Sequence, residues 1–291
     1  MNWAQIRTLV MFKQTVFGLP WALIGALFPF IDGNYHQPLN QWRTWCLILV
    51  AFTLARTSGM AFNRLIDRHI DARNPRTQHR PLQTGKVTVF QVTLLAVGCL
   101  IGFIICCWLI NPLCFALSFI PAALLVFYSF TKRFTAFCHL VLGLVEFFAP
   151  LMAWIAIKGT VDWPPILLGI AMCLWLTGMD IFYSLQDVCF DRQWRLRSAP
   201  VALGIKPAIV LAKVLHGLCV LVLIVTGLLV QASMIYYIGI FIVASIFSYQ
   251  HKMICPQNTH RIEKTFFVCN GWIAFCLLAF TAGEVIWRVL S

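Results

Sequence analysis

Charged residues are scarce in this chain. Asp, Glu, Lys and Arg make up only 11% of its 291 residues, whereas 60% of the residues are hydrophobic. Soluble domains carry about a quarter charged residues, so this composition excludes a soluble globular protein and indicates a polytopic membrane protein. No polar stretch of domain length separates the apolar runs. The net charge of +12 is therefore interpreted as a signal of membrane topology, and a nucleic-acid partner is not expected.

The chain also lacks the residue spacings of metal-binding cysteines. It has 12 cysteines but no C-x-x-C pair, and most of them lie in apolar runs, where a thiol packs as a small hydrophobic group. The seven histidines show no ligand spacing either, so a local hydrogen bond is their expected role. A small-residue cleavage site is missing after the first apolar run, which predicts a first span that is retained.

Nine apolar runs are long enough to cross about 30 Å of hydrocarbon. Short junctions, such as Asn111-Pro112, make the flanking helices antiparallel neighbours in a bundle. The sequence thus predicts an all-α fold in which residues 1–291 form a single transmembrane domain of nine helices. The runs cover residues 14–32, 44–62, 88–110, 112–129, 135–157, 165–185, 207–230, 232–249 and 266–288.

Basic residues divide unevenly between the two ends of these runs. If the N-terminus is cytoplasmic, only Arg43, Lys158 and Arg288 fall on the outer side, as the positive-inside rule requires. The sequence therefore predicts a multi-pass protein of the cell inner (plasma) membrane with a cytoplasmic N-terminus. Tryptophans expected to form an outer aromatic belt are Trp42, Trp45, Trp108, Trp154, Trp163 and Trp287. Basic residues assigned to topology or anionic lipid alone are Arg195, Arg197, Lys252, Arg261 and Lys264.

The first acidic cluster follows the second apolar run. Asn63, Asp67 and Asp71 are spaced by four residues, so on a helix they fall within about 80° of one another on one face. Carboxylates one turn apart at the mouth of a membrane helix repel each other and need a cation. Oxygen ligands without Cys or His in register suit magnesium.

A second acidic cluster ends the sixth run. Asp180, Tyr183, Asp187 and Asp191 have offsets of 3, 7 and 11, which again predict one helical stripe. Both clusters lie at the predicted cytoplasmic ends of their spans and lead into similar Pro- and Gly-containing loops, over residues of about 63–87 and 180–206. The two stripes are therefore expected to open on the same side of the membrane.

Cations surround these acids in the sequence. Carboxylates with magnesium on one side, and Arg and Lys on the other, are suited to gripping a diphosphate. An apolar bundle beneath the site favours a lipid diphosphate. Glu146, near the middle of the fifth run, either lines the cavity or pairs with another helix. The basic residues concerned are Arg64, Arg68, Arg73, Arg76, Arg80, Lys132, Arg133, Arg192 and Lys206.

Two other classes of protein remain open from the residues alone. A transporter or channel would pass a cation along such acids, but these acids gather at one face and no span has the broken centre typical of a midplane substrate site. A structural assembly subunit would leave the clustered acids and bases without a role.

At the two acidic clusters the chain resembles the UbiA-type intramembrane prenyltransferases, in particular their 4-hydroxybenzoate polyprenyltransferase-like branch. The family's first motif, Asn-Asp-xx-Asp-xxx-Asp, stands here as Asn63-Arg64-xx-Asp67-xxx-Asp71. The second, Asp-xx-Tyr-xxx-Asp, is intact from Asp180 to Asp187. Arg64 departs from the acid that many members carry, and resembles the form found in a subgroup tied to quinone synthesis. A non-benzoate acceptor is the alternative that this departure leaves open.

The resemblance implies a magnesium-dependent aromatic prenyltransferase with a polyprenyl diphosphate and an aromatic acid as substrates, in ubiquinone or menaquinone biosynthesis. It implies that two magnesium ions and the diphosphate are held by Asn63, Asp67, Asp71, Asp180 and Asp187. It implies diphosphate contacts from Arg73, Arg76, Tyr128 and Lys132. Arg64 is either a further diphosphate contact or a topology residue, and Lys13 is either near the site or a snorkelling lysine.

The implied reaction is electrophilic aromatic substitution. Magnesium, Arg and Lys make diphosphate a better leaving group, and the ring attacks the allylic cation that develops. Tyr183 and other aromatic faces are suited to stabilising that cation. Asp191 either orients or deprotonates the acceptor, or is a salt-bridge acid at a helix end. The predicted catalytic residues are Lys132, Tyr183 and Asp191.

Overall fold

The computed structural model describes residues 3–33, 39, 41–253 and 262–290, and every regular element in these ranges is helical. The predicted all-α class is therefore confirmed for the described part of the chain. The helices of the first half are α1 (Trp3–Leu9), α2 (Phe12–Leu27), η1 (Phe28–Phe30), α3 (Trp42–Ile66), α4 (Arg68–Asp71), α5 (Val89–Ile110), α6 (Pro112–Thr131) and α7 (Cys138–Lys158). Those of the second half are α8 (Trp163–Ser184), η2 (Leu185–Asp187), α9 (Val188–Gln193), α10 (Ala199–Leu203), α11 (Ile205–Leu229), α12 (Met234–Met253) and α13 (Ile262–Leu290).

Each predicted apolar run corresponds to one helix of the bundle. Among the described residues, eight helices are long and apolar enough to cross a membrane. The first run forms α2, which has only 16 residues, so the predicted count of nine spans is close but includes one short helix. Pro29 explains why α2 stops, because proline has no N–H to continue an α-helix and the chain tightens into η1 there.

Local sequence signals set the start of α5 and the junction between α5 and α6. Thr88 and Gln91 form a reciprocal capping box at the start of α5. Asn111 ends α5 and caps α6, its Oδ1 accepting from the backbone N–H of Cys114 at 2.8 Å. Pro112 follows at the first helical position, where a missing N–H costs nothing. The two helices therefore run antiparallel with no loop between them, as the sequence predicts.

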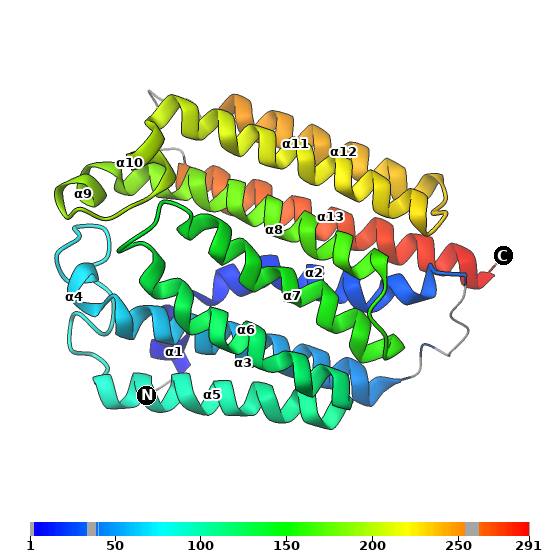
Figure 1. Ribbon diagram of the computed structural model, residues 1–291, viewed down its shortest axis with the longest axis horizontal. Helices are drawn as coiled ribbons and strands as arrows, with labels where there is room; N and C mark the ends of the chain where they lie inside the picture. The colour runs from blue at the N-terminus through cyan, green and yellow to red at the C-terminus, as the bar shows by residue number, and fades with distance from the viewer. Residues whose placement is uncertain (1–2, 34–38, 40, 254–261, 291) are drawn as a thin grey trace.

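The long helices run alongside one another, and the short helices gather at one end of the bundle (Figure 1). Helix α3 packs against α5, α7 against α8, α8 against α11, and α12 against α13. Helices α4, α9 and α10 cover the left end in Figure 1, while the C-terminus lies at the right end. The ends of α3 and α8 that carry the acidic clusters therefore open under the same cap of short helices.

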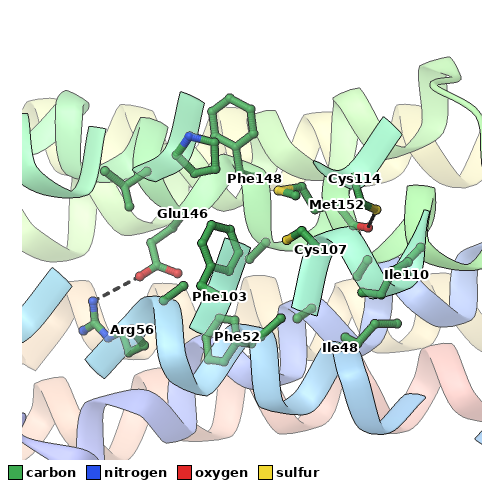
Figure 2. A pocket seen from close by; sticks show the side chains of 18 of the residues that line it. Ile48, Phe52, Arg56, Phe103, Cys107, Ile110, Cys114, Glu146, Phe148 and Met152 are labelled. Atoms are coloured by element: carbon green, nitrogen blue, oxygen red, sulfur yellow. Dashed lines mark hydrogen bonds and ion pairs between the residues drawn. The ribbon is translucent and has the colours of Figure 1, made fainter. Parts of the chain in front are cut away.

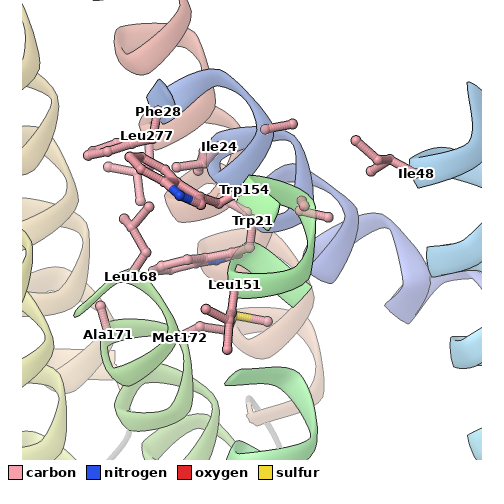
Figure 3. Close-up of a cluster of buried hydrophobic side chains, with 14 of the residues drawn as sticks. Trp21, Ile24, Phe28, Ile48, Leu151, Trp154, Leu168, Ala171, Met172 and Leu277 are labelled. Carbon is pink, nitrogen blue, oxygen red and sulfur yellow. The ribbon is translucent and has the colours of Figure 1, made fainter. Parts of the chain in front are cut away.

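Buried hydrophobic side chains, aromatic and aliphatic, fill the centre of the bundle between α2, α7, α8 and α13 (Figure 3). The indole rings of Trp21 and Trp175 stack with centroids 5.3 Å apart. Trp154 is completely buried in this cluster, so its predicted place in the outer aromatic belt is wrong. It faces the other helices because it lies on the inner face of α7, whereas Trp42, Trp163 and the remaining predicted belt residues are exposed or half-buried.

Two basic residues at the uncapped end, Arg288 and Lys158, make internal contacts. Arg288 pairs with Glu284 at 3.0 Å and also donates to the backbone carbonyls of Ile31 and Val230. Lys158 pairs with Asp32 at 2.6 Å. These contacts tie α13 and α7 to the residues that follow η1, so the end of the short first span is held in place. The described cysteines are all free thiols, most of them buried as predicted, and Cys255 lies outside the described residues.

Candidate active site

A large polar cavity opens at the capped end of the bundle. Its volume is about 1440 Å³ when counted out to its open mouth. Helices α2, α3, α6, α7 and α8 form its walls, and the cap residues Arg76 and Arg80 reach into it. Predicted site residues in its wall are Asn63, Arg64, Asp67, Asp71, Arg76, Tyr128, Lys132, Asp180, Tyr183 and Asp187.

The first acidic cluster keeps its helical register although α3 ends at Ile66. The backbone N–H of Asp67 donates to the carbonyl of Asn63 at 2.9 Å, and that of Asp71 to the carbonyl of Asp67 at 2.8 Å. These i to i+4 bonds hold the three side chains on one face, as the sequence predicts. Arg133 binds Asp67 Oδ1 at 2.9 Å and Arg80 binds Asp71 Oδ2 at 2.5 Å.

Arg64 lies beside Arg80, and both guanidinium groups approach Asp71 Oδ2. Its guanidinium donates to the carbonyl of Leu9 at 3.3 Å and to Asn63 Oδ1 at 3.0 Å, and lies 3.9 Å from Asp71. The residue is only 3% exposed. Contacts within the protein therefore engage at least three of the five N–H donors of Arg64, and the residue still lines the cavity.

The second acidic cluster is not one continuous stripe. Helix α8 ends at Ser184 and a 3₁₀ turn, η2, lies between it and the start of α9. A 3₁₀ turn advances about 120° per residue rather than about 100°, so three such residues rotate the next helix by about 60°. Asp180 and Asp187 line the cavity, but Asp191 does not. The predicted stripe therefore holds only as far as Asp187.

Arg76 closes over Asp187 and Tyr183. Its Nε and Nη2 bind the two oxygens of Asp187 at 3.0 and 2.5 Å, and its Nη1 donates to the Tyr183 hydroxyl at 2.8 Å. Burial alone disfavours the charge on Arg76, but the hydrogen bonds to Asp187 outweigh it and raise the pKa of Arg76. Asn74 also donates to Asp187 at 3.1 Å. This network fastens the loop after α4 to the end of α8.

Asp191 lies behind Lys132. The carboxylate is completely buried and lies 3.0 Å from Lys132 Nζ. Burial opposes the charge on Lys132, yet the nearby Asp191 carboxylate keeps the pKa of Lys132 above its usual value. Of the two alternatives for Asp191, the structure contains the salt bridge, which Asp191 forms with Lys132.

His139 is a site residue that the sequence did not reveal. Its Nδ1 lies 2.6 Å from Asp180 Oδ2, and its Nε2 accepts from the backbone N–H of Ala199 at 3.2 Å. It therefore joins α7, α8 and α10. Asp180 lies 41 residues away in sequence, so no local spacing could have indicated this pair.

The donor chemistry of the cavity fits a hard cation. Oxygen ligands enter from two sides, which suits magnesium. Each predicted ligand now faces a base, and within the described ranges no three acidic, His or Cys side chains are close enough to hold a metal together. Burial raises the pKa of Asp67 to about 6 and outweighs the opposing effect of Arg133. A metal at this site would replace Arg or His contacts of Asp67, Asp71, Asp180 and Asp187.

A second, apolar pocket (Figure 2) adjoins the polar cavity, because the two share lining residues of α3, α6 and α7. It lies between α3, α5, α6 and α7, and its volume is about 670 Å³ when counted out to its opening. The ion pair between Arg56 and Glu146, with nitrogen and oxygen 3.1 Å apart, lines both spaces and so marks their junction. Glu146 therefore both lines the cavity and pairs with another helix, the two roles that the sequence left open. Arg56 was missed, although it lies seven residues before Asn63 and therefore on the same helical face, about two turns deeper.

Several basic residues lie elsewhere. The Arg73 guanidinium stacks 4.6 Å from the ring centre of Trp194 and does not line the cavity, which differs from its expected diphosphate contact. Arg192 and Lys206 are also outside the cavity wall. Arg261 and the side chains of Lys13 and Lys264 lie outside the described part of the structure.

Known proteins of one family match this chain in sequence and fold. The sequence pattern of the UbiA prenyltransferase family matches residues 34–279. The chain is 34% identical over 231 residues, 78% of either chain, to a 4-hydroxybenzoate octaprenyltransferase of Alkalilimnicola ehrlichii. Its fold resembles the apo structure of a UbiA homolog from Aeropyrum pernix, with a TM-score of 0.82, 26% identity, and coverage of 94% of this chain and 98% of that one.

A more distant solved structure shares the fold. This is a UbiA homolog from Archaeoglobus fulgidus bound to DMAPP and Mg²⁺, with a TM-score of 0.73, 17% identity, and coverage of 97% of this chain and 99% of that one. The sequence match extends over most of the described helices and includes both acidic clusters. The chain therefore belongs to the UbiA prenyltransferase family.

Proposed function

We propose that this prenyltransferase transfers a polyprenyl group from its diphosphate to an aromatic acid, 4-hydroxybenzoate or a related quinone precursor. The observation that carries the proposal is the junction of the two spaces. A cavity lined by acids and bases continues into an apolar pocket, and an ion pair lies where they meet. These three environments suit the three parts of the reaction: a diphosphate, an isoprenoid chain and a carboxylated ring.

The diphosphate is assigned to the outer part of the polar cavity. Asp67 and Asp71 on one side, and Asp180 and Asp187 on the other, would hold Mg²⁺, and the bound metal would supply charge to the leaving diphosphate. The solved A. fulgidus homolog was bound to DMAPP and Mg²⁺, which supports this assignment. Once a metal takes their carboxylates, cations such as Arg76 become available to the phosphate oxygens.

The isoprenoid chain is assigned to the apolar pocket. Its wall is formed by side chains such as Ile48, Phe103, Cys107 and Met152, which offer no hydrogen-bonding competition to a hydrocarbon. The pocket begins at the level of Arg56 and Glu146, below the acids. A prenyl diphosphate that enters tail first would therefore place its C1 between the acids and this ion pair.

The acceptor is assigned to the space above Arg56. Seven residues separate Arg56 from Asn63, a rise of about 10 Å along α3, which leaves room for one aromatic ring between the diphosphate and the guanidinium. An acid whose carboxylate reaches Arg56 would present its ring to C1. Relatives such as the A. ehrlichii protein are named for 4-hydroxybenzoate, which supports an acceptor of this class.

In the proposed reaction, the C1–O bond breaks and diphosphate leaves with the electron pair. The ring carbon forms a bond to C1 and then loses its proton, for which the departing diphosphate is the nearest base. Lys132 stabilises the negative charge that develops on the diphosphate, and Asp191 acts through Lys132 as a positioning residue. The rings of Tyr128 and Tyr183 line the same space and are suited to stabilising the allylic cation. Apolar walls keep water away from that cation.

The capped end is assigned to the cytoplasmic side of the inner membrane. This end carries most of the exposed Lys and Arg residues, such as Arg7, Arg68 and Lys86, which favours it as the cytoplasmic end.

Product analysis tests the proposed function. Purified protein in detergent is incubated with a radiolabelled polyprenyl diphosphate, Mg²⁺ and a series of aromatic acids, and products are identified by mass spectrometry. The expected product is the acid with one hydrogen replaced by the prenyl group. Phenols that lack the carboxylate serve as matched acceptors and are expected to react poorly. Diphosphate hydrolysis without any prenylated ring, in the presence of every acid, would overturn the proposal.

A further inference from the structure

Arg64 fixes the orientation of the Asn63 side-chain amide. The guanidinium Nη1 donates to Asn63 Oδ1 at 3.0 Å, and the amide Nδ2 donates to Asp67 Oδ2 at 2.9 Å. Arginine only donates hydrogen bonds, and an ionised carboxylate only accepts them. A flipped amide would place its NH₂ against the guanidinium and its oxygen against the carboxylate, so the neighbours allow one orientation.

This orientation turns the oxygen of Asn63 toward the Arg64 guanidinium, whose positive charge opposes a divalent cation at the same oxygen. A divalent metal binds an asparagine through its oxygen, never through its NH₂ group. With an acid at position 64, as many family members have, the neighbour would accept from Nδ2 and would leave the oxygen available. The presence of Arg64 in place of an acid therefore determines whether the Asn63 oxygen can bind a metal.

We propose that Asn63 is a positioning residue for Asp67 in this chain and not a metal ligand, and that Arg64 imposes this role. The inference rests on the proposed magnesium site. Asp67 Oδ2 stays on the Asn63 amide, while Oδ1, now bound to Arg133 at 2.9 Å, is the oxygen offered to the metal. The first acidic cluster then supplies ligands from Asp67 and Asp71 alone, and water or phosphate oxygens complete the shell, as Mg²⁺ usually requires.

Arg64 also holds the N-terminal turn against the cavity. Its Nε donates to the carbonyl of Leu9 at 3.3 Å and its Nη2 to Met11 Sδ at 3.2 Å. Met11 has a left-handed backbone with φ of 46° and lines the cavity. Loss of Arg64 therefore has a structural effect at this turn as well, and the test must separate that effect from the orientation of Asn63.

Thiol substitution with Cd²⁺ provides a binding readout that does not depend on turnover. Cadmium favours thiolate over amide or carboxylate ligands, and a cadmium–thiolate bond gives an ultraviolet charge-transfer band. Asp67→Cys and Asn63→Cys are titrated with Cd²⁺, and the signal from the native thiols of the unsubstituted protein is subtracted.

Asp67→Cys is expected to gain one Cd²⁺ per protein with the thiolate band, whereas Asn63→Cys is expected to gain neither. A new band in both variants would show that position 63 holds the metal, and would overturn the inference while the metal site stands. A new band in neither variant would overturn the proposed metal site itself, and the inference with it.

Substitutions of Arg64 test the cause of the orientation. Lysine only donates, so Arg64→Lys is expected to keep the Mg²⁺ concentration for half-maximal turnover within about twofold of wild type. Glutamine both donates and accepts, so it no longer restricts the Asn63 amide to the orientation that positions Asp67. Arg64→Gln is therefore expected to raise this Mg²⁺ concentration by about 5- to 10-fold, the scale of one hydrogen bond. Arg7→Gln, an exposed site on α1, is the matched control. Reduced thermal stability of Arg64→Gln with unchanged Mg²⁺ dependence would assign Arg64 to the N-terminal turn only, and would overturn its role toward Asn63.

Discussion

The ion pair between Arg56 and Glu146 offers a test in which stability and acceptor use respond differently. The nitrogen and oxygen are 3.1 Å apart, and the two side chains are only 18% and 9% exposed. At an effective dielectric constant of about 20, unit charges at this distance attract each other by about 5 kcal/mol. Removing one partner from such a buried pair typically costs about 3–5 kcal/mol. Arg56→Gln and Glu146→Gln are therefore both expected to lower the free energy of unfolding by about this amount.

The double variant is expected to recover most of that stability, because a buried neutral pair carries no uncompensated charge. Acceptor use is expected to move in opposite directions in the single variants. Arg56→Gln leaves the Glu146 carboxylate, which repels the aromatic acid, so the KM for the acid rises. Glu146→Gln releases Arg56 from this ion pair, so the KM for the acid falls. A charge-assisted hydrogen bond of about 1.5–3 kcal/mol corresponds to a change of about 10- to 150-fold.

The assay combines unfolding in detergent with initial rates at varied aromatic acid and saturating prenyl diphosphate. Prenyl diphosphate KM serves as the control and should change little in the single variants. A KM for the acid that moves in the same direction in both single variants would refute the assignment of Arg56 to the acceptor. A double variant no more stable than either single variant would refute the charge argument.

Three further predictions concern the phosphate, the metal and the isoprenoid chain. Lys132→Ala is expected to lower kcat/KM for the prenyl diphosphate by about 10- to 150-fold. The control Lys252→Ala, at an exposed site on α12, should match wild type. Equal losses in both variants would indicate a general effect of basic charge. Burial raises the pKa of Asp67 to about 6, so protons compete with the metal below that pH. The apparent Mg²⁺ affinity should fall by up to about tenfold for each pH unit below about pH 6, and should level off above about pH 7. Mg²⁺ titrations that are unchanged down to about pH 5 would contradict this. Ala149→Phe, in the wall of the apolar pocket, should reduce turnover of a long prenyl diphosphate more than that of a dimethylallyl one; equal reductions measured with both would place the chain elsewhere.

The sequence predicts those parts of the site that depend on local helical geometry. Asn63, Asp67 and Asp71 share a face because i to i+4 hydrogen bonds continue across the end of α3. Arg56 obeys the same periodicity and could have been found as a charged residue in mid-span. The short Asn111-Pro112 junction likewise predicts correctly that α5 and α6 are neighbours in the bundle.

The remaining features depend on contacts between distant segments or on a change of helix type. His139 meets Asp180 across two helices, and Arg133 meets Asp67 across 66 residues, so neither pair has a local spacing. The 3₁₀ turn η2 rotates Asp191 out of the stripe that a continuous α-helix would give. Trp154 illustrates the same limit, because its depth in the membrane does not reveal which face of α7 is buried.

The central claim is that the two acidic clusters, on different helices, hold one metal-bound diphosphate. Asp67→Asn and Asp187→Asn test it when Mg²⁺-dependent prenyl transfer is measured on protein that elutes and melts as wild type does. Each substitution keeps the shape of the side chain but removes the charge that a divalent cation needs. Both variants are expected to lose Mg²⁺-dependent transfer. Full activity in either variant would contradict a single site shared by the two clusters.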